Sequence, residues 1–328
     1  MWKQKKKVTA YKCANRKCPC RISNLDKLTR SEKFLQKMVP THFTINYIYR
    51  EYHLTQEDIK HSAPRNLGTK IFRINKSDNV LGLILAFYVS FAISARKTAF
   101  ILQQMFQIPV SHQTVLNYAR AAAYYCHKFN LQNKSSMDSK AAGDETYIKI
   151  AGKNYYLFLF ISVDKKAIIS YHLADNRGAI PAVATINEAV RTLEPEEDIT
   201  CITDGNPAYA AAILFLNRKR KNKIVHKKVI GLQNLDQEST DYREFKQIIE
   251  RLNRTYKFHV RPAEGFGSFN GAMALTALFV THYNFLRPHT SLKYNVPIHI
   301  TGLDNFKTIQ AKWIAILNLA ALSYFGSG

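Results

Sequence analysis

The feature that most constrains the fold is a change of hydrophobic period near residue 142. Before it, apolar residues recur at helical spacing, whereas after it short apolar runs alternate with turn residues, which is typical of strands. Prolines and turn dipeptides separate these runs from one another. The order predicted from here is three strands, a helix, a strand and a helix, at 145–150, 155–163, 167–173, 179–193, 198–203 and 207–216.

This order predicts a mixed α/β sheet flanked by helices. A helical crossover of this length allows the fourth strand to lie parallel to the first. The ends of these two strands would then meet, with Asp144 near Asp204, 60 residues further along the chain. A single Asp at a strand edge is more often a turn or cap residue. The pairing of two such residues is what indicates a site.

The preceding region, 79–137, has the pattern of helices. The apolar run 80–95 is shorter than the roughly 20 residues of a spanning helix, so we expect a buried helix. A helix over 93–106, a short break and a second helix with Ser111 as its N-cap follow. This is a helix-turn-helix pattern, although an ordinary helical hairpin fits it too. The polar residues proposed to contact DNA are His112, Gln113, Asn117 and Arg120.

The charge balance indicates a polyanionic partner. Lys and Arg number 47 against 24 acidic residues, a net charge of +23. Such an excess attracts nucleic acid and says nothing about fold. The bases are spread along the chain and not placed beside an apolar anchor, which favours DNA over a membrane surface. Since the basic start is not followed by an apolar core, we expect a cytoplasmic, nucleoid-associated protein without a signal peptide.

The N-terminal region, 1–78, contains a cluster of three cysteines, Cys13, Cys18 and Cys20. Three thiolates this close could share a Zn²⁺ ion with His42 or His53 as the fourth ligand. A structural zinc site normally has two separated pairs of ligands, and this spacing is absent. The reading without bound zinc is therefore favoured.

A third acid must come from the segment after the fourth strand, where Glu238, Asp241, Glu244 and Glu250 compete. A buried stripe with helical spacing runs from Phe245 to Tyr256, and Glu250 lies on the opposite, polar face. That face also carries Asn253, Arg254 and Lys257. Asp241 and Glu244 fit an N-cap and its capping-box partner at the helix start. Glu250 could also simply pair with Arg254.

Three acids gathered from separate elements suit a pair of divalent cations. Mg²⁺ prefers carboxylate oxygens, and two ions about 4 Å apart can stabilise both the attacking and the leaving oxygen in phosphoryl transfer. Asp144, Asp204 and Glu250 are the predicted ligands and catalytic residues. Arg254 and Lys257 would hold DNA beside them.

In combination, these motifs resemble the catalytic core of bacterial and archaeal insertion-sequence transposases of the DDE type, closest to the group typified by insertion sequence six. The resemblance spans roughly residues 90–315. It implies an RNase H-like core, Mg²⁺ or Mn²⁺, nicking at transposon ends, strand transfer by the freed 3′-hydroxyl, and a homodimer or larger synaptic complex. The matching stretches are 143–150 with Gly152-Lys153, 203–205, 249–257, 265–269, 283–292 and Lys312-Trp313.

The chain departs from that family in one spacing. Asp204 and Glu250 are 46 residues apart, longer than the roughly 35 implied by the resemblance, which leaves Glu244 as a fallback. The excess falls in 217–241, whose basic run is typical of a solvated or disordered segment but could grip phosphates. Further candidates for DNA contacts are Lys219, Arg220, Lys221 and Arg287, while Asn284 and His289 are expected in DNA or structural contacts.

The predicted organisation has four parts, and two other functions stay open. An N-terminal region is followed by the helix-turn-helix region, an RNase H-like catalytic domain and a helical tail, at 1–78, 79–137, 138–295 and 296–328. The alternatives are an RNase H-like nuclease that cuts without joining and an inactive DNA-binding derivative.

Overall fold

The computed structural model describes residues 19–38, 77–134, 139–191, 198–229 and 237–325. The chain divides into two units, 1–53 and 54–328. In the first unit, helix α1 spans Pro19–Asp26 and helix α2 spans Arg30–Met38. Thr29 begins α2 with a capping box, because its backbone N–H donates to Glu32 Oε2 at 2.8 Å. Of the predicted zinc ligands, Cys13, Cys18 and the side chain of Cys20 lie outside the described residues.

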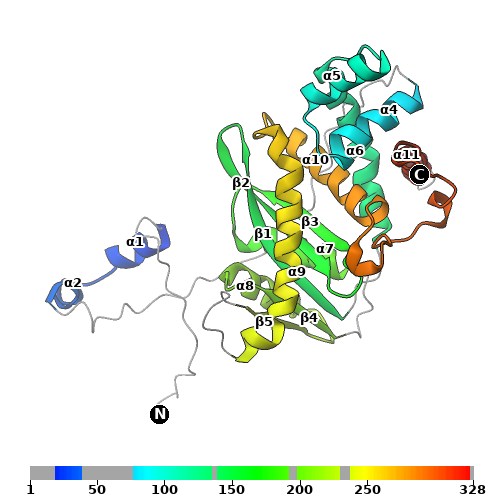
Figure 1. Ribbon diagram of the computed structural model, residues 1–328. Coiled ribbons are helices and arrows are strands. Elements are labelled where there is room, and N and C mark those ends of the chain that lie inside the picture. The colour runs from blue at the N-terminus through cyan, green and yellow to red at the C-terminus, as the bar shows by residue number, and fades with distance from the viewer. Residues whose placement is uncertain (1–18, 39–76, 135–138, 192–197, 230–236, 326–328) are drawn as a thin grey trace. The chain divides into compact units, whose positions relative to one another are not determined.

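The second unit is built on a five-stranded sheet in the order β3-β2-β1-β4-β5 (Figure 1). The first three strands form an antiparallel meander, with Asp144 of β1 opposite Leu159 of β2. The fourth strand lies parallel to β1, which confirms the predicted crossover. The strands are β1 (Lys140–Ile150), β2 (Lys153–Ser162), β3 (Ile168–Ala174), β4 (Ile199–Thr203) and β5 (Ile224–Lys228).

Strand β5 was not predicted, and it corrects the reading of the basic run as a solvated or disordered segment. It pairs in parallel with β4 from Ile199↔Ile224 to Thr203↔Lys228. Ile224 is buried at the sheet edge, and Asn217 brackets it by accepting from its N–H and donating to its carbonyl. Basic side chains on an edge strand discourage pairing with another chain at its open side, while the other side pairs with the sheet. The predicted phosphate contacts of this run stay predictions.

Each face of the sheet has its own hydrophobic core, because successive residues of β1 point to opposite faces. One face packs Phe158 and Phe160 against Tyr209 and the helices α7 (Ala179–Val190) and α8 (Pro207–Leu216). The other face packs Leu157 and Leu159 in one core with the long helix α9 (Gln237–Val260). Four more helices share this core: α4 (Asp78–Leu85), α6 (His112–Gln132), α10 (Phe269–Thr281) and α11 (Ile309–Phe325). In Figure 1, α9 lies across this second face of the sheet.

The helices before the sheet confirm most of the predicted pattern. The apolar run forms α4 (Asp78–Leu85) and a π-helical turn (Ala86–Ser90). Helices α5 (Ala95–Phe106) and α6 (His112–Gln132) follow, and the predicted N-cap Ser111 accepts from Thr114 N at 3.1 Å. Much of α6 is buried in the core beside the sheet, so the helix-turn-helix region shares a core with the catalytic region. The predicted domain boundaries stay predictions.

The C-terminal elements complete this second core. Helix α10 (Phe269–Thr281) runs into a π-helical turn (His282–Leu286), and α11 spans Ile309–Phe325. Trp313 of α11 is fully buried, and its ring N–H donates to Ser90 Oγ at 2.9 Å. None of the helices in the described ranges combines the length and apolar character that crossing a bilayer requires.

Candidate active site: carboxylates of β1 and of the end of β4

Three carboxylates meet where β4 ends beside β1. The parallel register aligns Ala142 with Ile202, so Asp204, directly after β4, comes level with Asp144. Oxygen atoms of Asp144, Glu145 and Asp204 all lie within 4.8 Å of one another. The predicted approach of Asp144 to Asp204 is therefore confirmed, whereas Glu145 is a member that the sequence reasoning missed.

Asp144 faces helix α9 (Gln237–Val260). Its Oδ2 lies 3.2 Å from Lys246 Nζ and accepts from Asn253 Nδ2 at 3.1 Å. Lys246 is buried, and an ammonium is kept out of water only where a carboxylate offsets its charge. The two α9 residues are seven positions apart, about two helical turns, so they lie on one face of the helix. That face meets the carboxylates.

Glu145 points to the opposite side of the sheet, toward the start of α8. Its Oε2 accepts from Tyr209 Oη at 2.6 Å, and its Oε1 accepts from Asn206 Nδ2 at 3.1 Å and Arg177 Nε at 2.7 Å. The Asn206 side chain also caps α8 by accepting from Ala208 N, and its backbone N–H donates to Asp204 Oδ1 at 3.0 Å. Asn206 therefore contacts both the Glu145 and the Asp204 carboxylates and connects them.

Gly143 is required by the packing behind the carboxylates. An added Cβ would stand 2.2 Å from the ring of Phe160, which lies opposite it in the strand pair. That ring belongs to the core around Tyr209, whose hydroxyl binds Glu145. The glycine thus lets an aromatic layer support the strand immediately before Asp144.

Burial and mutual repulsion raise the pKa of two of these acids. Burial contributes most to the raised pKa of Asp144, with Asp204 and Glu145 adding to it and Lys246 opposing it. Burial also leads for Asp204, where Glu145 raises the pKa further and the Asn206 N–H lowers it. Carboxylates held together in this way gain from a bound cation, which would remove the repulsion.

Glu250, the predicted third acid, is not a member of this cluster, yet its position on α9 is informative. It lies four residues after Lys246 and three before Asn253, the two residues that contact Asp144. By helical phase, Glu250 sits between them on the face toward the carboxylates. The predicted buried stripe is also present, with Ile249, Leu252 and Tyr256 almost fully buried. The catalytic role of Glu250 stays a prediction.

The assignment of Asp241 and Glu244 to the start of this helix is wrong. Helix α9 begins at Gln237, four residues earlier, and Asp241 accepts from Gln237 Nε2 at 2.8 Å within its first turns. The capping pattern alone does not locate a helix start, because Asp and Glu also suit positions inside the first turns. Both acids are exposed.

The donor set fits a divalent cation of the Mg²⁺ class. The cluster offers only carboxylate oxygens, which are hard ligands, and no Cys or His belongs to it in the described part of the chain. Asp144 and Asp204 would hold the ion. Glu145 already accepts hydrogen bonds from three residues, so it is better suited to orient its neighbours than to be a ligand.

The structure places the other predicted DNA contacts at several sites. Arg254 and Lys257 are exposed on α9, and Lys257 lies 4.8 Å from the centre of the Tyr147 ring. Lys219 and Lys221 lie between α8 and β5, where Arg220 Nε donates to Asn222 O at 3.3 Å. None of these positions has been tested against DNA, so their roles stay predictions.

The remaining candidates lie around the helix-turn-helix and α10. Gln113 Nε2 donates to Asn117 Oδ1 at 2.8 Å on the first turns of α6, where His112 is exposed. Arg120 is directed toward α10, with a guanidinium nitrogen 3.7 Å from a Cβ built on Gly271. Arg120 and Asn117 are both half-exposed, and the DNA contacts predicted for α6 stay predictions.

Asn284 and His289 make the structural contacts expected of them. The buried Asn284 side chain accepts from Ile168 N and donates to Ile168 O, both at 2.8 Å, and so ties the π-helical turn to β3. His289 Nε2 lies 3.2 Å from Tyr283 O. Arg287 lies over the Tyr283 ring, 5.8 Å from its centre.

The sheet order, with Asp144 inside β1 and Asp204 directly after β4, is that of the RNase H-like fold that the sequence predicted. A family model described as a DDE domain matches residues 139–272, which contain Asp144, Asp204 and Glu250. This is the segment that carries the sheet and α9. Residues 139–272 of the chain therefore match a DDE domain.

Two solved structures have a distant likeness to the chain. The magnesium-bound catalytic core of HTLV-2 integrase, in a trimeric form, is 16% identical and covers 49% of this chain and 95% of its own, with a TM-score of 0.32. A simian T-cell lymphotropic virus intasome in complex with the PP2A regulatory subunit B56 gamma is 15% identical, covers 62% and 73%, and has a TM-score of 0.34. No curated protein matches the chain. The assignment rests on the family match and the strand order.

Proposed function

We propose that this protein is a transposase that nicks DNA at transposon ends and joins the freed 3′-hydroxyl to target DNA, using divalent cations. The observation that carries the proposal is the meeting of Asp144, inside β1, with Asp204, directly after the parallel strand β4, within a segment that matches a DDE domain. Two Mg²⁺ or Mn²⁺ ions bound there would supply an activated oxygen nucleophile and stabilise the charge on the leaving oxygen. The Cys cluster is not needed for this chemistry.

The residues around the cluster would divide the remaining work. Asp144 and Asp204 hold the cations, and Glu250 reaches the same place from α9. Lys246 and Asn253 orient Asp144 through its Oδ2. Arg254 and Lys257 lie one and two turns after Glu250 on the same helix. They contact the DNA backbone on either side of the scissile phosphate.

The partner of this site is DNA, and the working form contains more than one subunit. A net charge of +23 favours a polyanion. Joining both ends of one element to a target needs two active sites held together, which a homodimer or larger synaptic complex provides. The first turns of α6 are the proposed element for recognising the transposon ends.

A reaction with labelled transposon-end DNA, supercoiled target and Mg²⁺ tests the proposal. We expect a nicked end and a covalent end–target product, both lost in Asp204→Asn. The fall should be at least about 10³-fold, since several kcal/mol of charge stabilisation disappear. Hydrolysis without a joined product would instead support an RNase H-like nuclease. Binding without cleavage in the wild type would support an inactive derivative.

A further inference from the structure

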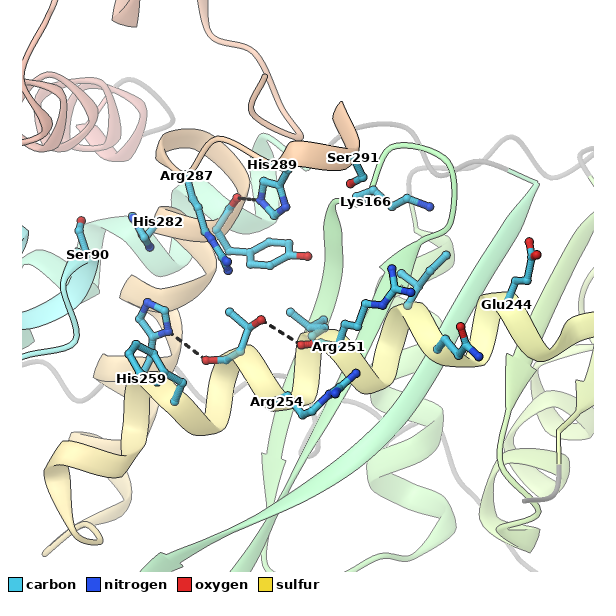
Figure 2. A pocket seen from close by; sticks show the side chains of 16 residues that line it. Ser90, Lys166, Glu244, Arg251, Arg254, His259, His282, Arg287, His289 and Ser291 are labelled. Atoms are coloured by element: carbon cyan, nitrogen blue, oxygen red, sulfur yellow. Dashed lines mark hydrogen bonds between the residues drawn. The ribbon is translucent and has the colours of Figure 1, made fainter. Parts of the chain in front are cut away.

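A second feature of α9 lies beside the catalytic face. A cavity of about 1060 Å³ is bounded by α9 on one side and by the π-helical turn and the segment after it, through Ser291, on the other (Figure 2). We call it the α9 groove. Arg251 projects from α9 and Arg287 from the opposite wall, with Lys166 at one end and His282 toward the other.

The α9 groove is strongly basic. Its lining contains the cations Lys166, Arg251, Arg254 and Arg287, and Glu244 is the one acid among the described lining residues. In the part of the chain that the structure describes, none of the three arginines forms an ion pair. Like charges facing one cavity repel each other, and a polyanion that enters it relieves the repulsion.

The inner wall of the groove is neutral. His282 is stacked on Trp313, and burial, with nearby His259 and Arg287, lowers its pKa to about 3. Burial likewise lowers the pKa of His259, with Arg287 adding to the effect and a hydrogen bond to Thr255 opposing it. The positive charge of the groove at neutral pH therefore comes from its lysine and arginine side chains. Such side chains neutralise the phosphates of a nucleic acid backbone.

An exposed aromatic ring distinguishes this surface from a plain basic patch. Phe258 lines the groove with 65% of its surface exposed. An unpaired base can stack on such a ring, whereas the bases of an intact duplex are already stacked on one another. A groove that combines guanidinium groups with an open phenyl ring thus suits a single strand.

The groove is also continuous with the catalytic face of α9. Arg254 lines it and lies one turn after Glu250, next to Asn253, which contacts Asp144. Arg251, Thr255 and Phe258 continue the lining around and along the same helix. These three residues lie about 80–140° around α9 from Glu250, so a strand that leaves the carboxylates would pass Arg254 and turn around the helix to enter the groove.

We propose that the α9 groove binds single-stranded DNA, namely the strand that has separated from its partner beside the cleaved phosphate. The arginines contact its phosphates, and Phe258 stacks on one of its bases. This proposal rests on the DNA substrate of the proposed function. It adds a binding site that the carboxylate cluster does not need for hydrolysis.

Equilibrium binding of the full chain to a labelled single-stranded oligonucleotide, and to a duplex of the same sequence, tests the proposal. The measurement is made with EDTA at several salt concentrations, so no cleavage occurs. We expect Arg251→Gln/Arg287→Gln to weaken single-strand binding and to lower its salt slope by about 1.4, or 0.7 for each lost phosphate contact. Phe258→Ala should weaken it by about tenfold.

Matched variants separate the groove from general charge and general exposure. Arg243→Gln/Arg261→Gln removes the same charge from exposed sites outside the groove, and Phe100→Ala removes a ring that is 67% exposed on α5. We expect both controls to affect single-strand binding far less than the groove variants. Equal losses in groove and control variants would overturn the proposal, as would a larger loss for the duplex than for the single strand.

The binding test stays independent of the reaction. Asp204→Asn should bind the single strand as the wild type does in EDTA, because it lies outside the groove. If the wild-type protein binds the single strand through the groove but cleaves no DNA with Mg²⁺, this inference stands and the proposed function is overturned. The reverse result, cleavage with no groove effect on single-strand binding, would overturn only this inference.

Discussion

Asp144 and Glu145 are neighbours in the chain, but they belong to two differently built sides of the sheet. The Asp144 side chain is 16% exposed and meets two groups from α9, a buried ammonium and an amide. The Glu145 side chain is 2% exposed and accepts hydrogen bonds from three residues, Tyr209 and Asn206 at α8 and Arg177 before α7. The Asp144 carboxylate can therefore exchange its hydrogen-bond partners, whereas the Glu145 carboxylate is fully occupied by its own.

The difference shows how one sheet end can be both reactive and rigid. On the α9 side, the contacts are few and come from a helix whose polar residues can rearrange around a cation. On the α8 side, Tyr209 is fully buried, and Asn206 connects Glu145 to Asp204. Such buried support keeps reactive side chains in place while they change partners. Four predictions test this difference between the α9 side and the α8 side of the sheet.

The largest effect is expected on the α9 side. Glu250→Gln should reduce end cleavage by about 10³-fold while the fold is retained, because a cation ligand is lost from a half-exposed position. Glu244→Gln removes the same charge from an exposed site on the same helix. We expect it to cleave nearly as well as the wild type. If Glu244→Gln proves the more damaging change in single-turnover cleavage assays, α9 delivers a different acid and the division fails.

An intermediate effect is expected on the α8 side. Glu145→Gln keeps the shape but places an amide against three donors and leaves the Arg177 charge unpaired. We expect cleavage to fall roughly 10- to 100-fold, an effect of lost positioning. The Mn²⁺ concentration for half-maximal rate should stay the same. A large increase in that concentration, as for a lost ligand, would make Glu145 the third ligand in place of Glu250.

The sequence predicted the α9 side better than the α8 side, for a physical reason. Asp144 and Asp204 follow from strand order, and Glu250 follows from helical phase, since both depend on regular periods. Glu145 depends on Tyr209 and Arg177, which lie 64 and 32 residues away and come close only in the folded chain. A strand residue next to a catalytic acid has no local pattern that reveals such partners.

Two further elements show where local patterns mislead. The segment holding β5 has a strong basic composition, but pairing with β4 and the burial of Ile224 outweigh it. At the start of α9, Asp241 with Glu244 has the spacing of a capping box, yet the helix continues upstream to Gln237. For β5, tertiary pairing decides the structure, whereas at α9 the same two acids also suit positions inside the first turns of a longer helix.

A stability change tests the packing on the α8 side. Gly143→Ala should destabilise the fold by roughly 1–3 kcal/mol, because its Cβ would collide with the Phe160 ring. Gly302→Ala is the control, since no atom lies within 4 Å of a Cβ added there. The measurement is urea unfolding followed by circular dichroism. Equal midpoints for both variants would show that the aromatic layer yields easily and does not hold β1 rigid.

The smallest effect concerns the protons and cations of the two aspartates. Their pKa values are raised in the fold. Their contribution to the free energy of unfolding is therefore fully present below the ordinary value of 3.8 and is lost as pH rises through the raised values. At pH 7, Mg²⁺ should restore it, because binding to the folded state alone stabilises that state. Ten times its Kd would raise Tm by roughly 3–5 °C.

The pH dependence of that Mg²⁺ effect separates the two sides of the sheet. The Tm increase should shrink as pH falls toward 4, since protons then compete for Asp144 and Asp204. Asp204→Asn should lose the increase and, without cations, melt at a higher temperature than the wild type at pH 7, because one of three clustered charges is gone. Glu145→Gln should keep the increase, because its carboxylate is occupied by Tyr209, Asn206 and Arg177. A Glu145→Gln protein that no longer responds to Mg²⁺ would place the cation on the α8 side and reverse the division between the two neighbours.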